Sequence, residues 1–263
     1  MRSTTRGRKD KLMKTIYIRG GKGSNTAIKV MTHHLETLGH KVVRSKEDPF
    51  QVGLSWGCSY DGPEPFLNSG VNRFNKFTAF SKFRDAGASC PFTYPIAYIE
   101  NHVIPRGEVW LARKRQHTKG KDIVVCKDTE SARAIARRGE HDFFSVFIPT
   151  DTEYRVWVLG GKAFATYEKV YKGQGEYDGF MRNRRFGFKF VKRDELIGNH
   201  KIEGPCIKAV QSLGMDWGAV DVLKGKDGKF YVLEINSMPH IDSIQRSSGV
   251  RLAKHISLWA EKQ

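Results

Sequence analysis

The stretch VDVLKGKDGKFYVLEINSMPHI, residues 220–241, decides the fold of this chain. It predicts two apolar strands joined by a turn at the Asp-Gly pair 227–228, a dipeptide that is typical of tight hairpins. Glu234 and Asn236 stand two residues apart on the second strand, so their side chains are expected on one face of the sheet. Asp221, on the first strand, is expected to join them from across the pair.

Three oxygen-bearing side chains on one rigid sheet face suit Mg²⁺, which prefers carboxylates together with phosphate oxygens and keeps several waters. The alternative is a half-solvated face on which the acids are incidental. The apolar flanks and Pro239 favour the metal site, because an unpaired buried carboxylate is costly. Asp221, Glu234 and Asn236 are therefore the predicted metal ligands.

The composition fits a globular protein with an anionic partner. The chain has 263 residues, 39% of them hydrophobic, and a formal net charge of +17. Such a charge favours nucleic acid, an acidic polypeptide or a phosphorylated ligand as partner, but it says nothing about fold. The four cysteines form no CxxC pair, which argues against a zinc site and a disulfide framework and favours a cytoplasmic setting.

No apolar run approaches the length of a membrane span, and no membrane partner is expected. The basic N-terminus lacks the apolar region of a secretory signal, and residues 1–13 are expected to be a flexible basic tail.

The order of predicted elements indicates an α+β protein rather than a doubly wound fold. A β-α-β beginning is followed by a linker-like segment at 58–70, rich in Gly, Pro, Asn and Ser, and then by antiparallel hairpins. One hairpin turns at the Gly pair 160–161. Residues 171–200 are expected to be a basic loop. Helices are expected at 25–38, 75–86, 129–138, 205–213 and 247–260.

Three further segments carry chemistry suited to anions. RKRQHTKGKD (113–122) has the Gly and the cations to close over phosphates, although a solvated basic turn explains it as well. GGKGSN (20–25) lies between a strand and a helix, where an anion can bind, but it lacks a dinucleotide fingerprint and fits a plain turn. RNRRFGFKFVKR (182–193) interleaves aromatic and basic residues, which suits phosphates, stacked bases or a solvated loop.

Taken in order, these segments resemble the ATP-grasp superfamily, particularly carboxylate–amine ligases related to ribosomal-protein glutamate ligases and D-alanine–D-alanine ligases. The similarity runs from about Met13 to the end. It is most specific at 220–241, which is similar to the family's GVD…(V/M)E(V/I)N…PG segment. The other matching segments are NKFTAFSKFRDAGASCPFTY (75–94), VWLARKRQHTKGKDIVV (109–125), FSVFIP (144–149) and TEYRVWVLGGKAFATYEK (152–169), and GGKGSN is similar to the first loop of the D-alanine ligases.

The resemblance implies roles for single residues. Arg155 would be catalytic, stabilising the γ-phosphate and acyl-phosphate charge, and the acid–acid–amide triad would hold Mg²⁺, or Mn²⁺, between the phosphates of ATP. The ATP-binding residues would be Lys76, Arg113, Thr118 and Gly120 at the phosphates and Val146, Phe147 and Ile148 at the adenine. The substrate side would include Gly21, Ser24, Arg182, Asn183, Arg184 and His240.

Two of these positions depart from the family. Arg113 stands where a Lys is common, and His240 stands where Gly usually follows Pro239. The implied fold is ATP-grasp, with a small N-terminal lobe (14–72), a central lobe with the phosphate-covering hairpin (73–148) and a C-terminal lobe with the metal site (149–263). The last two lobes would hold ATP between them.

The implied function is ATP-dependent amide ligation through an acyl-phosphate, with release of ADP and phosphate. The substrates would be an amino acid or small amine and an acceptor that the basic charge suggests is an acidic polypeptide or a nucleic acid. Two alternatives stay open. One is a noncatalytic nucleic-acid-binding protein on the same scaffold, and the other is an ATP-grasp kinase that phosphorylates a hydroxyl.

Overall fold

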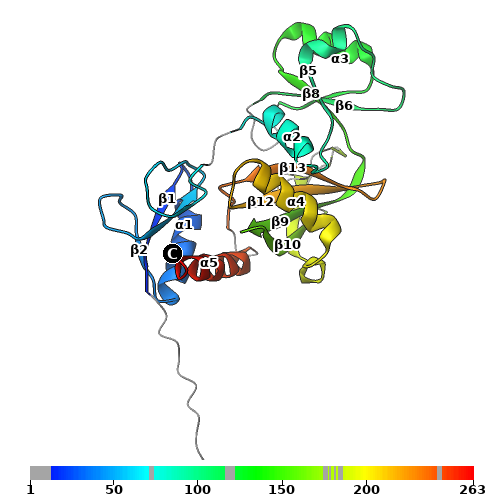
Figure 1. Cartoon of the computed structure of the whole chain (residues 1–263). Helices are drawn as coiled ribbons and strands as arrows, with labels where there is room; N and C mark the ends of the chain where they lie inside the picture. Colours follow the sequence, from blue (N-terminus) through cyan, green and yellow to red (C-terminus); the bar gives the residue numbers. More distant parts are fainter. Residues whose placement is uncertain are drawn as a thin grey trace, which may run out of the picture. The chain divides into compact units, whose positions relative to one another are not determined.

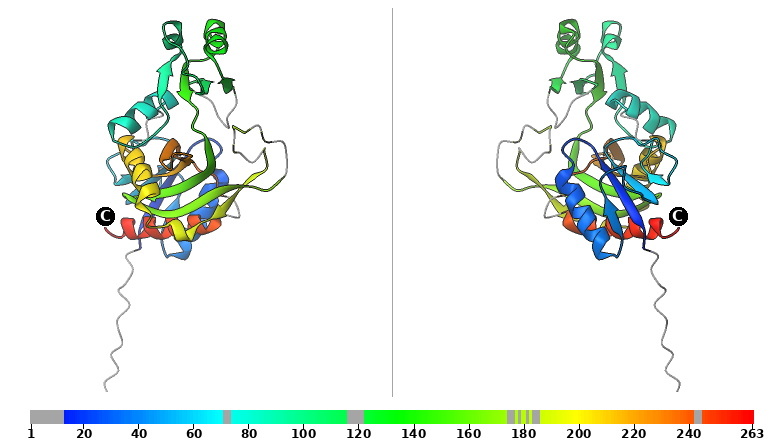
Figure 2. Two further views of the ribbon diagram at one scale, coloured as in Figure 1. Left: turned by 90° about the vertical axis from the view of Figure 1, so that its right-hand side faces the viewer. Right: turned by 90° about the vertical axis from the view of Figure 1, so that its left-hand side faces the viewer.

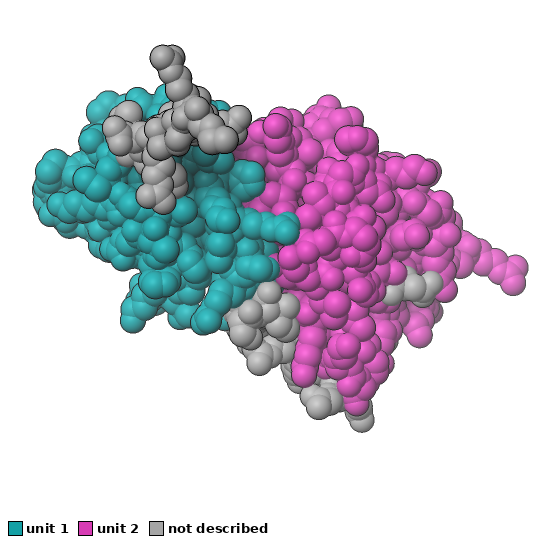
Figure 3. Space-filling view, turned by 90° about the horizontal axis from the view of Figure 1, so that it is seen from below, with its two compact units in different colours: residues 1–71, 237–263 teal, residues 72–236 magenta. Residues whose placement is uncertain are grey.

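The computed structural model describes residues 13–70, 74–115, 122–173, 177, 179–180, 182, 186–241 and 245–263. Thr118, Gly120, Asn183 and Arg184 lie outside the described residues, as does most of the predicted basic tail. The chain divides into two compact units (Figures 1 and 3): residues 1–71 together with 237–263 form unit 1, and residues 72–236 form unit 2. The predicted lobe boundary at 148/149 stays a prediction.

Unit 1 begins as the sequence predicts, with a parallel β-α-β arrangement. Its sheet has the order β2-β1-β3-β4, and all of its pairs are parallel. Helices α1 and α5 pack against each other, and α1 lies beside β1 (Figure 2, right). The elements are β1 (Thr15–Gly20), α1 (Asn25–Thr37), β2 (Lys41–Val43), β3 (Val52–Trp56), β4 (Phe66–Leu67) and α5 (Arg246–Ala260).

The C-terminal helix is tied to this N-terminal sheet by buried polar contacts. His40 Nδ1 accepts a hydrogen bond from the Lys14 amide, so its Nε2 carries the proton and donates to Ser257 Oγ at 2.7 Å. The Ser257 hydroxyl in turn donates to Glu261 Oε1. His40 and Ser257 are both buried, so each of their polar atoms needs such a partner. The bond between them joins α5 to the residue just before β2.

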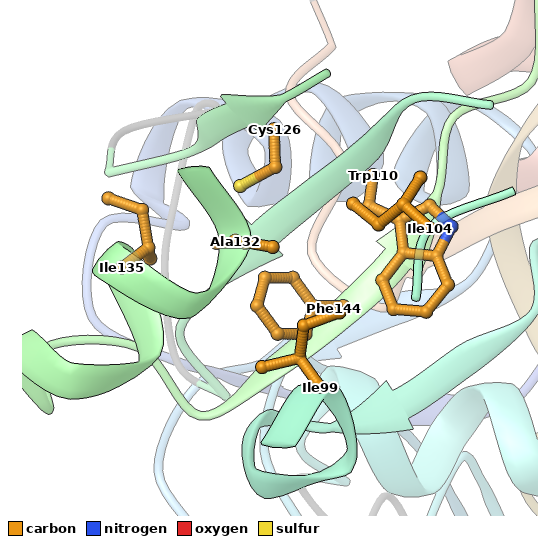
Figure 4. Packing of buried hydrophobic residues seen from close by; sticks show 8 residues of the cluster. Ile99, Ile104, Trp110, Cys126, Ala132, Ile135 and Phe144 are labelled. Carbon is orange, nitrogen blue, oxygen red and sulfur yellow. The ribbon is translucent and has the colours of Figure 1, made fainter. Parts of the chain in front are cut away.

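The first part of unit 2 is a small antiparallel sheet with its own core. The strand order is β5-β8-β6-β7. Side chains from η1, β6, β7, α3 and β8, among them Trp110 and Phe144, form the apolar cluster of Figure 4. Helix α3 is capped by the Asp128 side chain and ends at Gly139, whose φ of 66° favours glycine. The elements are α2 (Lys76–Asp85), β5 (Thr93–Pro95), η1 (Ile96–Glu100), β6 (Trp110–Arg113), β7 (Val124–Cys126), α3 (Thr129–Arg138) and β8 (Phe143–Val146).

The second part of unit 2 is a five-stranded antiparallel sheet, and it carries the candidate site. The strand order is β11-β10-β9-β12-β13, and α4 packs against the four strands β9, β10, β12 and β13. Valines 156, 158, 220 and 222 alternate with the residues of the opposite face and are fully buried. The elements are β9 (Thr150–Leu159), β10 (Lys162–Tyr171), β11 (Phe188–Lys192), η3 (Asp194–Leu196), α4 (His200–Ser212), β12 (Trp217–Gly225) and β13 (Phe230–Asn236).

Three expectations about local structure were wrong. The linker-like segment contains β4, and the predicted loop at 171–200 contains β11, which begins with alternating aromatic and basic residues at 188–190. Helix α4 begins at His200 rather than Pro205. The Asn199 side chain accepts a hydrogen bond from the Lys201 amide, and the Glu203 carboxylate accepts one from the Gly198 amide, so the helix starts before its proline.

Candidate functional site

The charged face of the five-stranded sheet aligns the predicted residues in rows. Asp221 on β12 lies directly opposite Glu234 on β13 and, on its other side, opposite Arg155 on β9. Asn236 lies opposite Ala219, one step further along the same face. The structure therefore brings the three predicted metal ligands onto one face of adjacent strands.

A β-bulge makes this arrangement possible. The register of the hairpin shifts between Asp221 and Val222, which leaves Leu233 unpaired on β13. Continued without the shift, the pairing of Lys224 with Phe230 would set Asp221 opposite Leu233, and Glu234 would point to the other face. The bulge is thus what places both carboxylates on one side of the sheet.

Asp221 is held by two cations. Arg155 donates Nε to Oδ1 at 2.7 Å and Nη2 to Oδ2 at 2.9 Å, a bidentate pair, and Lys169 Nζ lies 3.3 Å from Oδ2. Only 5% of the Asp221 side chain is exposed. Burial alone would raise its pKa, but Arg155 and Lys169 outweigh that effect and hold the pKa at about 2. The carboxylate is therefore ionised at neutral pH.

Lys169 and Glu153 form a second buried pair that the sequence reasoning missed. The Lys169 ammonium donates to Glu153 Oε1, and both side chains are nearly inaccessible to solvent. Burial raises the pKa of Glu153, and Lys169 opposes the rise. The pKa of Lys169 is itself raised, since Asp221 and Glu153 overcome the opposing effect of its burial. Lys169 therefore bridges two carboxylates on the sheet face.

Another bulge explains why Lys169 was missed. The register of the β9–β10 hairpin shifts at Phe164, between the pairs Ala163–Val158 and Ala165–Trp157. A hairpin continued without that shift would put Lys169 opposite Thr152, on the face away from Glu153. The segment 152–169 was recognised, and the Glu153-x-Arg155 spacing within it was the one signal that could have identified Glu153.

Lys76 reaches the site from the start of α2. Its Nζ lies 2.5 Å from Glu234 Oε2, and both side chains are partly exposed. The helix begins there because the Asn75 side chain caps it by accepting from the Thr78 amide. Burial would raise the pKa of Glu234, but the Lys76 charge prevails and lowers it. Glu234, the predicted metal ligand, and Lys76, the predicted phosphate contact, are thus in direct contact.

Arg113, at the end of β6, is a buried cation whose charge interacts with that of Glu234. Its guanidinium lies 5.9 Å from the Phe80 ring centre and 6.0 Å from that of Phe143, and Nη1 is 3.5 Å from Ser145 Oγ. Burial lowers its pKa to about 10, while the Glu234 charge opposes the change. Arg113 therefore remains charged at neutral pH.

The predicted adenine segment is the connection between the two sheets of unit 2. Val146 ends β8, with its amide donating to Phe92 O, and the Phe147 amide donates to Val109 O. Val146, Phe147 and Ile148 are all half-buried. The ring of Phe180 lies 5.0 Å from that of Phe147 in a T-shaped contact. This segment thus has an aromatic neighbour from the 171–200 region.

Arg182 contacts the start of β9, the strand that follows this connection. Its Nη2 donates to Thr150 O at 2.7 Å, and its guanidinium lies over the rings of Tyr177 and Phe188. The predicted substrate role of Arg182 stays a prediction.

The remaining predicted substrate residues are in unit 1. The Gly21 amide donates to Trp56 O, and the Ser24 hydroxyl donates back to Gly21 O. Gly57 follows Trp56, has a φ of 76°, and lies so close to Met238 that an added Cβ would fall 2.7 Å from the Met238 Cβ. His240 is exposed, two residues beyond Met238. The two loops thus converge on Gly57, and the binding roles of Gly21, Ser24 and His240 stay predictions.

The site residues fit ATP and a divalent cation on chemical grounds. Lys76, Arg113, Arg155 and Lys169 outnumber the acids Glu153, Asp221 and Glu234 among the described residues, so phosphate would meet a surplus of positive charge. The buried Asn236 Nδ2 has no hydrogen-bond partner among the residues that the structure describes, a feature often found where a ligand belongs. Within the described ranges no three His, Cys, Asp or Glu side chains form a metal cluster.

Comparison with known proteins identifies the family. The model of the RimK-like ATP-grasp domain matches residues 110–260. The chain belongs to this family. The match covers β6 through α5 and includes the whole charged sheet face. The expected superfamily is therefore confirmed.

Curated relatives of the RimK-like chain carry the name probable alpha-L-glutamate ligase. A protein of Haemophilus influenzae (strain PittEE) is 28% identical over 224 residues, which cover 78% of this chain and 72% of that protein. One of Histophilus somni (strain 2336) is 31% identical over 112 residues, which cover 43% of this chain and 35% of that protein. The chain thus spans about a third of the length of the Histophilus somni relatives that it matches.

Solved structures confirm the ATP-grasp fold. The ATP-grasp ligase PsnB complexed with a minimal precursor aligns with a TM-score of 0.67 at 15% identity, over 94% of this chain and 99% of PsnB. D-alanine–D-alanine ligase from Bacillus anthracis aligns with a TM-score of 0.64 at 13% identity, over 95% and 99% of the two chains.

Among the residues that the structure describes, no helix has the length and apolar character to cross a membrane.

Proposed function

We propose that this protein is an ATP-dependent ligase that forms an amide bond through an acyl-phosphate and releases ADP and phosphate. The observation that carries the proposal is the row Arg155–Asp221–Glu234 across three strands, with Lys76 on Glu234 and Lys169 on Asp221. Family membership supports it, and so does the name of the curated relatives, glutamate ligase.

In this proposal Asp221, Glu234 and Asn236 would hold Mg²⁺, which would neutralise the negative charge of the ATP phosphates. The chain's own cations complete the charge balance. Lys76 and Arg113 contact phosphate oxygens from the side of α2 and β6, and Arg155 stabilises the charge that develops on the transferred group. No side-chain nucleophile is required, because the protein contributes positioning and charge neutralisation.

Buried ion pairs suit this task because they are already ordered. Arg155 is fixed by two hydrogen bonds to Asp221, so little side-chain freedom is left to lose when ATP binds. Asp221 stays ionised at any pH well above 2, so its charge is available to a metal at neutral pH. Lys169 also contacts the carboxylates of both Asp221 and Glu153.

The substrates are proposed by class: an amino acid or small amine, and an acceptor that is an acidic polypeptide. The net charge of +17 supports an anionic acceptor. A nucleic-acid acceptor is a second possibility under the same charge argument, and dependence of binding on salt would accompany either.

The test is ADP release, screened against single amino acids with and without acidic peptides, followed by mass analysis of the product. We expect ADP release that depends on one amino acid, and a product heavier by that amino acid less water. A product heavier by a phosphate would instead identify a kinase. No ADP release in the presence of every amino acid and peptide, from protein that binds ATP, would refute the ligase proposal.

A further inference from the structure

The turn between α3 and β8 holds both ends of the basic connection that follows β6. On one side, the Asp142 amide donates to Arg113 O at 2.9 Å, and the Asp142 carboxylate accepts from the Arg115 amide at 2.7 Å. On the other side, His141 Nε2 lies 3.0 Å from Asp122 O. A carbonyl oxygen only accepts, so Nε2 carries the proton and donates. Two adjacent residues thus reach the outgoing and the returning end of one connection.

On the His141 side, burial and backbone geometry show that the contact is built in, whereas the Asp142 arm is exposed. His141 is 8% exposed, and within the described part of the chain its Nδ1 has no hydrogen-bond partner, so the bond to Asp122 O orients the ring. Asp122 adopts a φ of 59°, which is uncommon for a residue with a side chain and persists only where surrounding contacts hold it. We call the contacts of His141 with Asp122 and of Asp142 with Arg113 and Arg115 the clamp. Directly after Asp142, Phe143 pairs with Arg113 in the sheet, so the clamp extends the β6–β8 pairing.

The clamp also continues to Lys76. The Lys76 amide, in the first turn of α2, donates to Arg115 O at 3.3 Å. The amides of a helix's first turn have no partner within the helix, so Arg115 supplies one from outside. A chain of contacts therefore runs from the Asp142 carboxylate through the backbone of Arg115 to Lys76, whose ammonium contacts Glu234.

We infer that Asp142 and His141 are positioning residues for nucleoside triphosphate binding. They fix the backbone on which Arg113 and Lys76 approach the phosphates, without touching the nucleotide themselves. The inference rests on the proposed function for its ligand, whereas the clamp itself is a property of the protein without nucleotide. Fixing the backbone at Arg113 and Arg115 lowers the conformational freedom that these two residues would otherwise lose on binding.

The experiment compares matched variants of the full chain. Asp142→Ala and His141→Leu each remove one arm of the clamp. Asp142→Asn keeps an acceptor oxygen, His141→Gln keeps a donor at the position of Nε2, and Glu140→Gln changes a neighbouring exposed charge. Two quantities are measured: the affinity for ATP with Mg²⁺, and hydrogen exchange at the Arg115 amide in protein without nucleotide.

We expect Asp142→Ala to speed exchange of the Arg115 amide roughly tenfold and to weaken ATP binding by about the same factor, since one charge-assisted hydrogen bond is lost. His141→Leu should also weaken ATP binding, while the three conservative variants stay within about twofold of wild type. In steady state the KM for ATP should rise while kcat and the KM for the amino acid stay nearly unchanged.

The outcomes separate the clamp from the proposed function. Unchanged Arg115 exchange in Asp142→Ala would overturn the clamp, and faster exchange with unchanged ATP affinity would overturn the positioning role. If Asp142→Ala fails to fold, Asp142→Ser is measured in its place, and if His141→Leu fails to fold, His141→Ala is measured in its place, with the same losses expected and the same outcomes overturning the inference. A wild-type protein that does not bind ATP would count against the proposed function, and Arg115 exchange would still decide the clamp.

Discussion

Asp221→Asn is expected to abolish ADP release and to lower the free energy of unfolding by about 3 kcal/mol at pH 7. The substitution removes the charge that holds Arg155 and Lys169 and leaves two buried cations less well paired. Urea unfolding at several pH values measures the stability, and a coupled ADP assay measures the activity.

The stability difference between wild type and Asp221→Asn should depend on pH in one direction. The folded pKa of Asp221, about 2, is below its ordinary value of 3.8. Its ionisation therefore stabilises the fold fully above pH 4 to 5, and that contribution, about 2 kcal/mol, is lost as pH falls toward 2. Asp227→Asn, in the exposed turn of the same hairpin, is the control and should cost much less. A deficit of the same size at pH 7 and near pH 2 would contradict the ion-pair account.

Lys169→Met is expected to destabilise the protein by about 3 to 5 kcal/mol, because it leaves Glu153 buried without its cation. The pKa of Glu153 is already raised by burial and should rise further, so the deficit should grow as pH increases and shrink as Glu153 takes up a proton. Denaturant unfolding at pH 5 and pH 8 measures this.

The double variant Glu153→Gln/Lys169→Met separates stability from function. Replacing both partners removes the unpaired charge, so most of the lost stability should return. ADP release should stay low, because Lys169 also contacts Asp221. Lys192→Met is the matched control: it breaks an exposed pair with Asp194, which should contribute no more than about 1 kcal/mol. Equal stabilities of Lys169→Met and Lys192→Met would show that the buried pair does not matter.

The candidate site was predictable from the sequence only where it depends on spacing along one strand. Glu234 and Asn236 share a face because side chains of a strand alternate, and the structure confirms this. The pairing of Asp221 with Glu234 is also observed, but it depends on the bulge at Leu233. No residue type in the hairpin indicates where that bulge lies. Lys169 was missed for the same reason, since the bulge at Phe164 decides which face it joins.

The predicted elements agree with the structure where the hydrophobic periodicity is strong, and they differ from it where polar residues interrupt that periodicity. The parallel start of unit 1 and the hairpins of unit 2 were expected and are observed. Strand β11 was missed because it lies in a strongly basic segment and contains two lysines, at 189 and 192. The start of α4 was missed because Pro205 was taken as a first-turn residue, whereas Asn199 caps a helix that begins five residues earlier, at His200.

Calorimetric titration of ATP into wild type and Glu234→Gln, each with and without Mg²⁺, tests the central claim most directly. The claim is that Asp221, Glu234 and Asn236 hold the ion that bridges ATP to the sheet. We expect wild type to bind ATP at least tenfold more tightly with Mg²⁺ than without it, and Glu234→Gln to lose that difference. Glu195→Gln, at an exposed acid outside the site, should behave as wild type. ATP binding that is equally tight without Mg²⁺, or a Glu234→Gln variant with the full Mg²⁺ dependence, would contradict the claim.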